Sequence, residues 1–434
     1  MSWKSTTLRA VAEVDLGRQR APQHENGSHI VSYLRAANVK DGSLDLNDVL
    51  EMNFTPKEQQ VFALKPGDLL MTEGSGSRSV VGASAFWRGE IEGTVCFQNT
   101  LLRLRPRPEL IDGRFLSWWV KGARESGLLA SIAGGANIYH LGADRVRQLP
   151  LMLPPIEEQR RIADFLDAET ARMTRLQSRY ERVLELLEER GAVMVRSLIA
   201  GQDVEGGYPG NDLRVPWLGE VPAAWAITTL GRISRTYTGT TFPREFQGML
   251  SGDLPFVKVS DFSRANERSE LRDSANWVTR QVAVKLGGRV VPRGAILYAR
   301  VGAAMLLNQR RLTTRDAIVD DNVRGVLFAA GHVRYWLHVL GAVDLAAFAN
   351  PGPVPSVSES QVAAIPVPFP PVAEQILIAD RIDAQLEESH RSKILLSRQV
   401  SLLQERRRSV ITAAVSGEID VTTACGWTGG PHAL

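Results

Sequence analysis

Apolar side chains recur at alternating steps of four and three residues over a long stretch that follows Pro154 and Pro155. This spacing places them on one face of an α-helix, which is the pattern of a coiled-coil seam. Proline favours an extended approach and Gly201 favours a helix end, so we predict roughly 40 helical residues, on the order of 60 Å long. Glu169 and Arg190 interrupt the seam. Its apolar members are Ile162, Leu166, Met173, Leu176, Tyr180, Val183, Leu187 and Met194.

The chain contains this segment twice. LPLMLPPIEEQRRIADFLD begins at Leu149, and IPVPFPPVAEQILIADRID begins at Ile365, a constant offset of 216 residues without a gap. The second copy ends at Gly417 as the first ends at Gly201. Two long copies at one period indicate two structural units. A long helix with a single apolar stripe needs a partner, so we predict that the two copies pair with each other in antiparallel orientation. Two unrelated surface helices would not explain the constant offset.

The two regions outside the repeat read as strands and turns. Short apolar runs at residues 61–64, 68–71 and 101–104 are bounded by Gly and Pro and predict strands, whereas residues 115–121 predict a helix. The second region repeats features of the first: Gly239 matches Gly17, and residues 292–297 parallel residues 66–70. These similarities predict one scaffold used twice, with different surface residues.

The predicted fold class is therefore α+β, with two similar mixed α/β domains separated by two long antiparallel coiled-coil helices. The predicted boundaries are 1–148 for the first domain, 149–204 for the first helix, 205–364 for a linker and the second domain, 365–418 for the second helix, and 419–434 for a flexible tail.

Composition adds the cellular setting. The chain has 434 residues, a formal net charge of +3 and only two cysteines, Cys96 and Cys425, which cannot form a disulfide framework. It contains no signal peptide and no apolar run of 18 or more residues, so we expect a cytoplasmic protein that does not enter the membrane. The small excess of Lys and Arg lies in the two non-repeated regions, as contact with phosphate would require.

Several enzymatic signatures are missing from the sequence. No Asp or Glu is followed two positions later by Lys, and neither a GxxxxGK[ST] phosphate loop nor an HExxH motif occurs. The sequence Asn350-Pro351-Gly352 only superficially matches an adenine-methyltransferase motif, because no glycine-rich cofactor loop precedes it. We therefore predict no catalytic residues, no metal site and no cofactor in this chain.

The doubled segments at residues 149–167 and 365–383, together with WLGEVPAAW at residues 217–225, resemble the DNA-specificity (S) subunit of type I restriction–modification enzymes. The resemblance covers nearly the whole chain in the family's order. It implies a non-catalytic subunit in which each domain reads half of an asymmetric, bipartite site in double-stranded DNA. It also implies that the helices space the domains and dock two methyltransferase (M) subunits, with restriction (R) subunits completing the complex. These partners would use S-adenosylmethionine, ATP and Mg. We assign docking to Glu158, Gln159, Ile162, Glu374, Gln375 and Ile378.

Base edges are read by Arg, Lys, Asn and Gln, and phosphates are held by basic and hydroxyl side chains. In the first domain the candidates lie at a strand end, in a glycine-containing turn and in the loop before the helix. They are Arg35, Asn38, Lys40, Thr72, Ser75, Ser77, Arg78, Ser79, Asn137 and His140. The candidates in the second domain are Thr240, Thr241, Arg244, Lys258, Ser260, Arg300, Asn308, Gln309 and Arg310.

Two other functions compete with DNA recognition. A coiled-coil scaffold that binds only protein would show no salt-dependent DNA binding, and it leaves the two basic domains unexplained. A fused enzyme with its own methyltransferase requires motifs that the sequence lacks.

Overall fold

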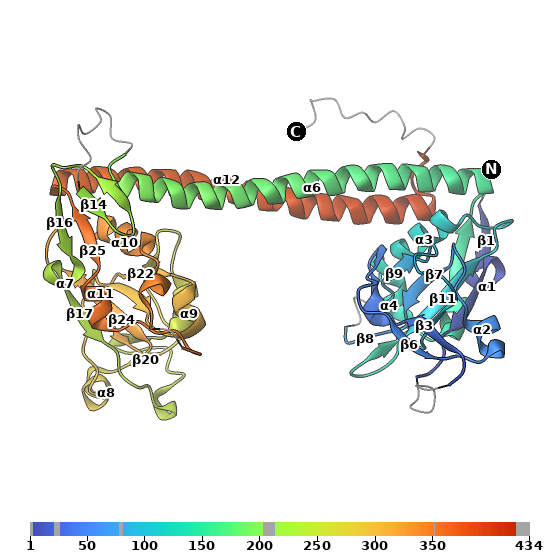
Figure 1. Cartoon of the computed structure of the whole chain (residues 1–434), viewed down its shortest axis with the longest axis horizontal. Helices are drawn as coiled ribbons and strands as arrows, with labels where there is room; N and C mark the ends of the chain where they lie inside the picture. Colours follow the sequence, from blue (N-terminus) through green and yellow to red (C-terminus); the bar gives the residue numbers. More distant parts are fainter. Residues whose placement is uncertain (1–2, 21–26, 78–80, 203–212, 351, 422–434) are drawn as a thin grey trace. The chain divides into compact units, whose positions relative to one another are not determined.

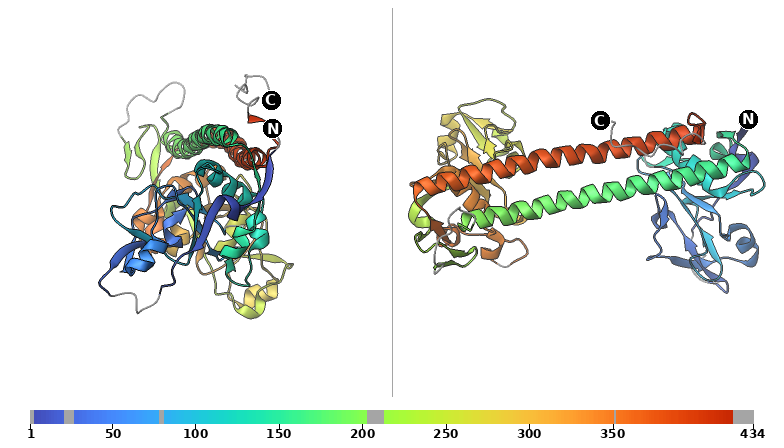
Figure 2. Two further views of the ribbon diagram at one scale, coloured as in Figure 1. Left: turned by 90° about the vertical axis from the view of Figure 1, so that its right-hand side faces the viewer. Right: turned by 90° about the horizontal axis from the view of Figure 1, so that it is seen from above.

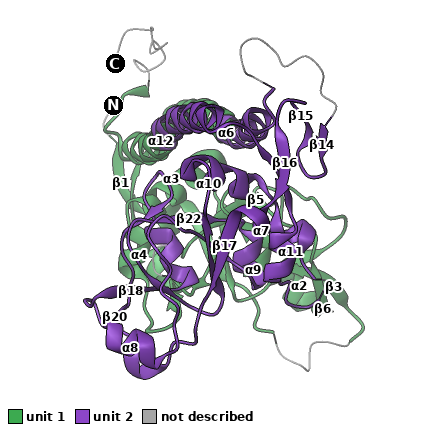
Figure 3. Ribbon diagram, turned by 90° about the vertical axis from the view of Figure 1, so that its left-hand side faces the viewer, with its two compact units in different colours: residues 1–181, 398–434 green, residues 182–397 purple. Residues whose placement is uncertain are grey.

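The computed structural model describes residues 3–20, 27–77, 81–202, 213–350 and 352–421 (Figure 1). The chain divides into two compact units: residues 1–181 with 398–434 form unit 1, and residues 182–397 form unit 2 (Figure 3). Two long helices, α6 (Ile156–Ile199) and α12 (Val372–Ser416), each contribute one part to each unit. Their lengths of 44 and 45 residues confirm the predicted helices. Gly201 and Gly417 follow them with φ values of 74° and 81°, a conformation that favours glycine.

Unit 1 is built on a four-stranded antiparallel sheet in the order β2-β11-β7-β9. These strands are β2 (Ala12–Leu16), β11 (Leu101–Pro106), β7 (Leu69–Thr72) and β9 (Ser84–Phe86). A second sheet contains β10 (Val95–Phe97), β3 (Ile30–Leu34) and β6 (Leu50–Asn53). The other strands form three pairs: β1 (Lys4–Thr7) with β13 (Pro150–Leu153), β8 (Gly74–Ser75) with β12 (Tyr139–His140), and β4 (Val39–Lys40) with β5 (Ser43–Leu44). The helices are α1 (Leu8–Val11), α2 (Pro56–Phe62), α3 (Gly113–Glu125), α4 (Leu128–Ile132) and α5 (Ala143–Arg147). The apolar face of α3 packs on the four-stranded sheet in one core.

Unit 2 has a five-stranded sheet in the order β17-β24-β21-β22-β19. These strands are β17 (Ser234–Thr238), β24 (Val323–Phe328), β21 (Ile296–Ala299), β22 (Arg310–Thr313) and β19 (Glu270–Leu271). The other strands are β20 (Trp277–Val278), β18 (Leu254–Val257) and β23 (Ile318–Val319) in one sheet, β16 (Ala226–Thr229) with β25 (Pro366–Phe369), and β14 (Leu213–Val215) with β15 (Gly219–Val221). The helices are α7 (Leu230–Ile233), α8 (Arg280–Lys285), α9 (Gly302–Leu306), α10 (Val333–Ala342) and α11 (Glu359–Ala363).

The two units share their scaffold down to the register of individual strands. Thr7 faces Pro150 across β1 and β13, and Thr229 faces Pro366 across β16 and β25. The matched glycines have one role in both units: a Cβ on Gly17 would lie 2.2 Å from the Gln98 carbonyl oxygen, and one on Gly239 would lie 1.8 Å from that of Asp320. These close backbone approaches explain why glycine occurs at both positions.

The long helices run in opposite directions within each unit (Figure 2). In unit 1, Ile162 and Leu166 of α6 share a core with Ile411 of α12, and in unit 2 the shared core includes Leu198 and Ile382. Between these ends the predicted coiled-coil seam is only partly buried, because Leu176, Tyr180 and Leu187 are half-buried and Val183 is exposed. The apolar stripe is therefore more deeply buried near the ends of the helix than in its middle.

Three local predictions need correction or fall outside the described residues. Residues 61–64 are not a strand: α2 extends to Phe62, because Pro56 is its first residue and Thr55 caps it by accepting a hydrogen bond from Glu58 N. Residues 419–421 do not belong to a flexible tail, since Val421 is buried in the core of unit 1. The glycine-rich linker at residues 206–210 and the tail residues 422–434 lie outside the described residues.

Candidate nucleic-acid interface

The repeated Glu-Gln pair attaches each domain to a long helix. In unit 1, Trp3 Nε1 donates to Glu158 Oε1 at 3.1 Å, and the Gln159 amide donates to the Pro154 carbonyl at 2.9 Å while its Oε1 accepts from Asp112 N at 2.8 Å. Because Gln159 is only 1% exposed, its side-chain amide supplies the hydrogen bonds that water would otherwise make to backbone groups at the start of α6.

Unit 2 repeats this attachment with equivalent atoms. Trp225 Nε1 donates to Glu374 Oε2 at 2.8 Å, the Gln375 amide donates to the Pro370 carbonyl at 2.8 Å, and Gln375 Oε1 accepts from His332 N at 2.8 Å. We call each set a Gln clasp: Gln159 or Gln375 with the backbone groups that it bonds.

The clasps correct the predicted docking residues. Gln159, Gln375, Ile162 and Ile378 are buried inside their own unit, and Glu158 and Glu374 are bonded to tryptophan. The four buried residues therefore attach domains to helices and cannot contact another subunit, whereas the half-buried Glu158 and Glu374 stay predictions. From sequence alone, a buried polar pair on a helix cannot be distinguished from an exposed polar pair.

A second attachment lies two helical turns further on and differs between the units. Asp167 accepts from Trp118 Nε1 at 2.9 Å and from Arg114 at 3.2 Å, and these side chains are partly exposed. In unit 2, Asp383 instead pairs with Arg334 and accepts from His338 Nε2 at 2.8 Å. Burial by itself would raise the pKa of Asp383, but the hydrogen bonds from His338 and Arg334 outweigh burial and hold that pKa well below its ordinary value.

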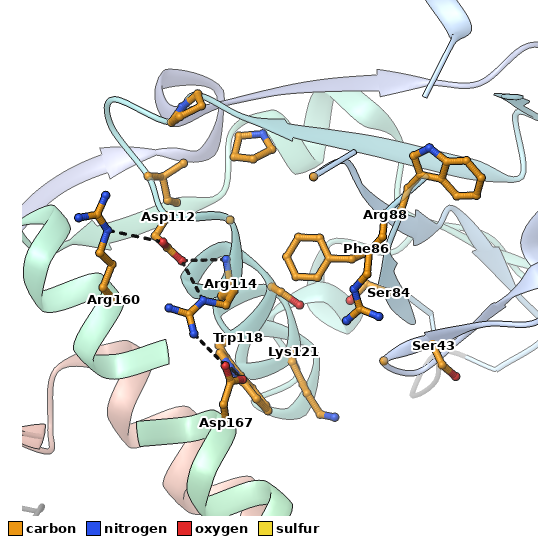
Figure 4. Close-up of a pocket in the computed structure, with 18 of the residues that line it drawn as sticks. Ser43, Ser84, Phe86, Arg88, Asp112, Arg114, Trp118, Lys121, Arg160 and Asp167 are labelled. Carbon is orange, nitrogen blue, oxygen red and sulfur yellow. Dashed lines mark hydrogen bonds and ion pairs between the residues drawn. The ribbon is translucent and has the colours of Figure 1, made fainter. Parts of the chain in front are cut away.

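Each attachment borders a cleft between domain and helix. In unit 1 the cleft has a volume of about 820 Å³, and Phe86 and Trp118 lie among the cations Arg114, Lys121 and Arg160 (Figure 4). In unit 2 the cleft measures about 1080 Å³ and is lined by residues of α6, α10 and α12. The sequence did not single out the cations of the first cleft, because isolated Arg and Lys residues carry no spacing signal.

In the first domain, the structure brings two predicted segments together. Ser75 pairs with Tyr139 across β8 and β12, and His140 Nδ1 lies 2.7 Å from Glu73 Oε2. Asn137 is exposed beside this strand pair, and Ser77 is exposed in the turn after β8. These residues form one polar edge of unit 1. Arg78 and Ser79 lie outside the described residues.

The remaining first-domain candidates are engaged within the domain. Asn38 is buried and its amide donates to the carbonyls of Asp45 and Asp48, while the buried Thr72 hydroxyl accepts from Gly82 N at 3.2 Å. Both hold loops, so we remove them from the candidate contacts. Arg35 pairs with Asp48, and Lys40 Nζ lies 3.9 Å from Asp45, so both cations remain near the surface with a carboxylate partner.

In the second domain, four predicted residues gather around Phe242, and we call this group the Phe242 cluster: Thr240, Thr241, Phe242, Arg244 and Lys258. The Phe242 ring stacks on Phe256 with centroids 3.7 Å apart, and Lys258 Nζ lies 5.1 Å from the Phe242 centroid. Thr240 donates to the Leu286 carbonyl at 2.7 Å, whereas Thr241 and Arg244 are exposed. Ser260 is exposed just beyond Lys258.

The other second-domain candidates lie elsewhere. Arg310 is buried, its Nε donates to the Leu340 carbonyl at 3.0 Å, and burial lowers its pKa to about 10. The Asn308 amide donates to the carbonyls of Gly341 and Val343 at 3.0 Å. These two side chains hold the end of α10 and leave the candidate set. Gln309 lines the cleft beside the helices, and Arg300 Nε donates to the Asp321 carbonyl at 3.2 Å.

Residues 2–185 match the family model of the type I restriction modification DNA specificity domain. This chain is similar to specificity subunits of type I restriction enzymes. It is 25% identical over 251 residues to the StySPI specificity subunit of Salmonella potsdam, covering 56% of this chain and 50% of that one. It is 27% identical over 177 residues to the EcoKI specificity subunit of Escherichia coli K12, covering 40% and 36%. The chain thus spans about half the length, or less, of these two relatives.

Two other comparisons extend over nearly the whole chain. A putative specificity subunit, MjaX of Methanocaldococcus jannaschii, is 20% identical over 97% of this chain and 94% of its own. A solved structure of a type I R-M system matches with a TM-score of 0.75 at 16% identity, covering 96% of this chain and 98% of that one. The HsdS subunit of Thermoanaerobacter tengcongensis matches with a TM-score of 0.56 at 15% identity, covering 96% and 97%. Within the described part of the chain, no helix is both long and apolar enough to cross a membrane.

Proposed function

We propose that this chain is the non-catalytic DNA-recognition subunit of a type I restriction–modification complex. Each domain reads one half of an asymmetric, bipartite site in double-stranded DNA. The chain needs no cofactor of its own, and S-adenosylmethionine, ATP and Mg belong to the methyltransferase and restriction subunits that assemble on it.

The observation that carries this proposal is that the two units share one scaffold but differ in the segments that follow the equivalent strands β7 and β21. In both units the glutamine Nε2 donates to a proline carbonyl and its Oε1 accepts from a backbone N–H, and the strand registers repeat. In contrast, β7 is followed by the strand β8, which pairs with β12, whereas the equivalent strand β21 is followed by the short helix α9. A repeated scaffold with divergent edges suits two half-sites of different sequence.

Genome methylation mapping tests the proposal directly. In a strain with this system active, we expect methylated adenine in a split motif whose two halves differ. Exchanging residues 1–148 for the same region of another specificity subunit should change one half of the motif only. A strain without such a motif, or a change in both halves, would contradict the proposal.

Partner docking needs a surface that the Gln clasps leave open. Along the part of the helices that belongs to unit 2, the apolar residues Val183, Leu186, Val193, Ile394 and Leu395 are exposed. Exposed apolar side chains on a helix mark a protein interface, and we place a methyltransferase contact there. Ile394→Ser with Leu395→Ser should abolish co-purification with the methyltransferase subunit. Retained co-purification would place the contact elsewhere.

A scaffold that binds only protein is the competing function, and salt titration separates the two. Phosphate contacts make the logarithm of affinity fall linearly with the logarithm of salt concentration. DNA binding by the assembled complex should show such a slope, and the absence of DNA binding would favour the scaffold.

A further inference from the structure

The loop between β17 and β18 presents an apolar tip at the surface of unit 2. Leu250 is 81% exposed and Met249 is 44% exposed. The loop is nevertheless anchored, because Trp277 N donates to the Met249 carbonyl at 2.8 Å and Gly248 N donates to Asn276 Oδ1 at 2.9 Å. Fixed exposure of two large apolar side chains is unfavourable in water and indicates a binding surface.

Two cations are held over aromatic rings of this loop and of its anchoring strand. Lys285 Nζ lies 5.4 Å from the centroid of Phe246, and Arg315 Cζ lies 5.3 Å from that of Trp277, the residue that anchors Met249. Stacking on a ring fixes where each charge points and contributes on the order of 0.5–1 kcal/mol at an exposed site. Two positive charges are therefore held over rings that belong to the loop or to the residue that anchors it.

Two carboxylates near these residues form hydrogen bonds with other groups. Asp253 accepts from the backbone N of Arg280 at 2.9 Å, and Asp273 accepts from Trp277 Nε1 at 3.1 Å. Both carboxylates stabilise the local structure. Because the Phe242 cluster adjoins the loop through the hydrogen bond from Gln247 Nε2 to the Phe242 carbonyl at 3.0 Å, the tip extends the surface already proposed to face DNA.

An exposed apolar side chain with cations nearby fits duplex DNA better than a protein. The cations match backbone phosphates, and the apolar side chain matches the faces of stacked bases. Proteins that insert such wedges partly unstack a base step and kink the duplex, and they recognise steps that open easily.

We propose that Leu250, supported by Met249, inserts between base pairs of the half-site read by the second domain and kinks the DNA there. This inference rests on the proposed function, since it takes DNA as the ligand. It adds a sequence preference at a base step that no polar side chain needs to contact.

The test uses the full chain assembled with its methyltransferase subunit and a duplex that carries the mapped split motif. The probe is 2-aminopurine, whose fluorescence rises on unstacking, placed in turn along the half-site that does not change when residues 1–148 are exchanged. The methylated adenine is left out, because methyltransferases extrude their target base. We expect a fluorescence rise at one step with the natural chain and its loss with Leu250→Ser. Affinity should fall at least about tenfold, as loss of one buried leucine contact predicts.

The matched control is Leu307→Ser, which removes a leucine of similar exposure, 67%, from the end of α9. It should keep the fluorescence rise and the affinity. The salt dependence of binding should be the same for Leu250→Ser and the natural chain, because leucine neutralises no phosphate.

Each other outcome is decisive. Specific binding without unstacking at any tested position, or unstacking that survives Leu250→Ser, overturns the wedge while leaving DNA recognition intact. Loss of methyltransferase co-purification in Leu250→Ser would assign the tip to a protein contact. Absence of specific binding by the natural chain would overturn the proposed function itself.

Discussion

The two units hold their domains in the same way at one point and in different ways at the next. The Gln clasp uses the same atoms in both units, at distances that agree within 0.1 Å for the bond to proline (2.9 and 2.8 Å). Two turns further along the helix, Asp167 meets a tryptophan and Asp383 meets a histidine. The first contact satisfies buried backbone groups at the start of the helix. The second joins side chains only, so its chemistry has diverged.

The largest expected effect tests the identity of the clasps. Gln159→Ala and Gln375→Ala each leave two or more buried backbone groups without a partner, which we expect to destabilise the unit concerned by about 3 kcal/mol. Hydrogen exchange measured separately over each unit should show similar losses for the two variants. Glu157→Ala, at an exposed position beside the first clasp, is the control and should change little. If only one of the two variants lost protection in its own unit, the two clasps would not be equivalent.

The aspartates should differ where the glutamines agree. The side chain of Asp383 is 17% exposed and is paired with a largely buried arginine and histidine, so Asp383→Asn should cost unit 2 about 2 kcal/mol. Asp167 is more exposed, and Asp167→Asn should cost unit 1 about 0.5 kcal/mol. Urea unfolding followed by unit-resolved hydrogen exchange measures both. Equal costs would show that the exchange of tryptophan for histidine has no energetic consequence.

Acid should reveal the same asymmetry. The pKa of Asp383 is lower in the folded chain than the ordinary value of about 3.9, so the folded state binds its proton less readily than the unfolded state. Its contribution is therefore complete above about pH 4 and is lost as the pH falls through the lowered folded value. Comparing the natural chain with Asp383→Asn from pH 6 to pH 2 should show their stabilities converging at the acid end. A constant difference would contradict this assignment.

The smallest expected effect is on DNA binding by the Phe242 cluster. Lys258 lies over Phe242 at the proposed DNA surface, and Lys258→Gln should weaken binding uniformly across sequences and reduce the salt slope by about 0.9. Arg311→Gln serves as a comparison, because its guanidinium is occupied by the Phe262 carbonyl at 2.7 Å and its slope should not change. An unchanged slope for Lys258→Gln would exclude this lysine from phosphate contact.

The sequence predicted the architecture because the internal duplication is visible as a repeated sequence at a constant offset. The long helices, their glycine ends, the matched glycines and the strands β7 and β11 follow from spacing and turn residues alone. The helix α2 was missed because residues 61–64 are apolar but too few to show a period, while the deciding cap at Thr55 lies upstream.

The candidate site was less predictable, because polar residue types serve two purposes. Asn38, Asn308 and Arg310 have the chemistry of base readers, yet they bond buried carbonyls within their own unit. Only tertiary packing decides between the two roles. The apolar tip at Leu250 was missed for the opposite reason: chemistry-based selection passes over leucine, and its exposure is visible only in the fold.

Unit 1 takes its last core residues from the far end of the chain. Ile411, Ala414 and Val415 of α12 pack in its core, and a Cβ on Gly122 of α3 would lie 2.7 Å from Val415. During synthesis, the first domain therefore emerges early but keeps an uncovered apolar face until residues 411–415 of α12 are made. Unit 2, whose residues 182–397 are contiguous, closes a shorter loop and can finish first. The domain that is translated first is thus the one that completes its folding last.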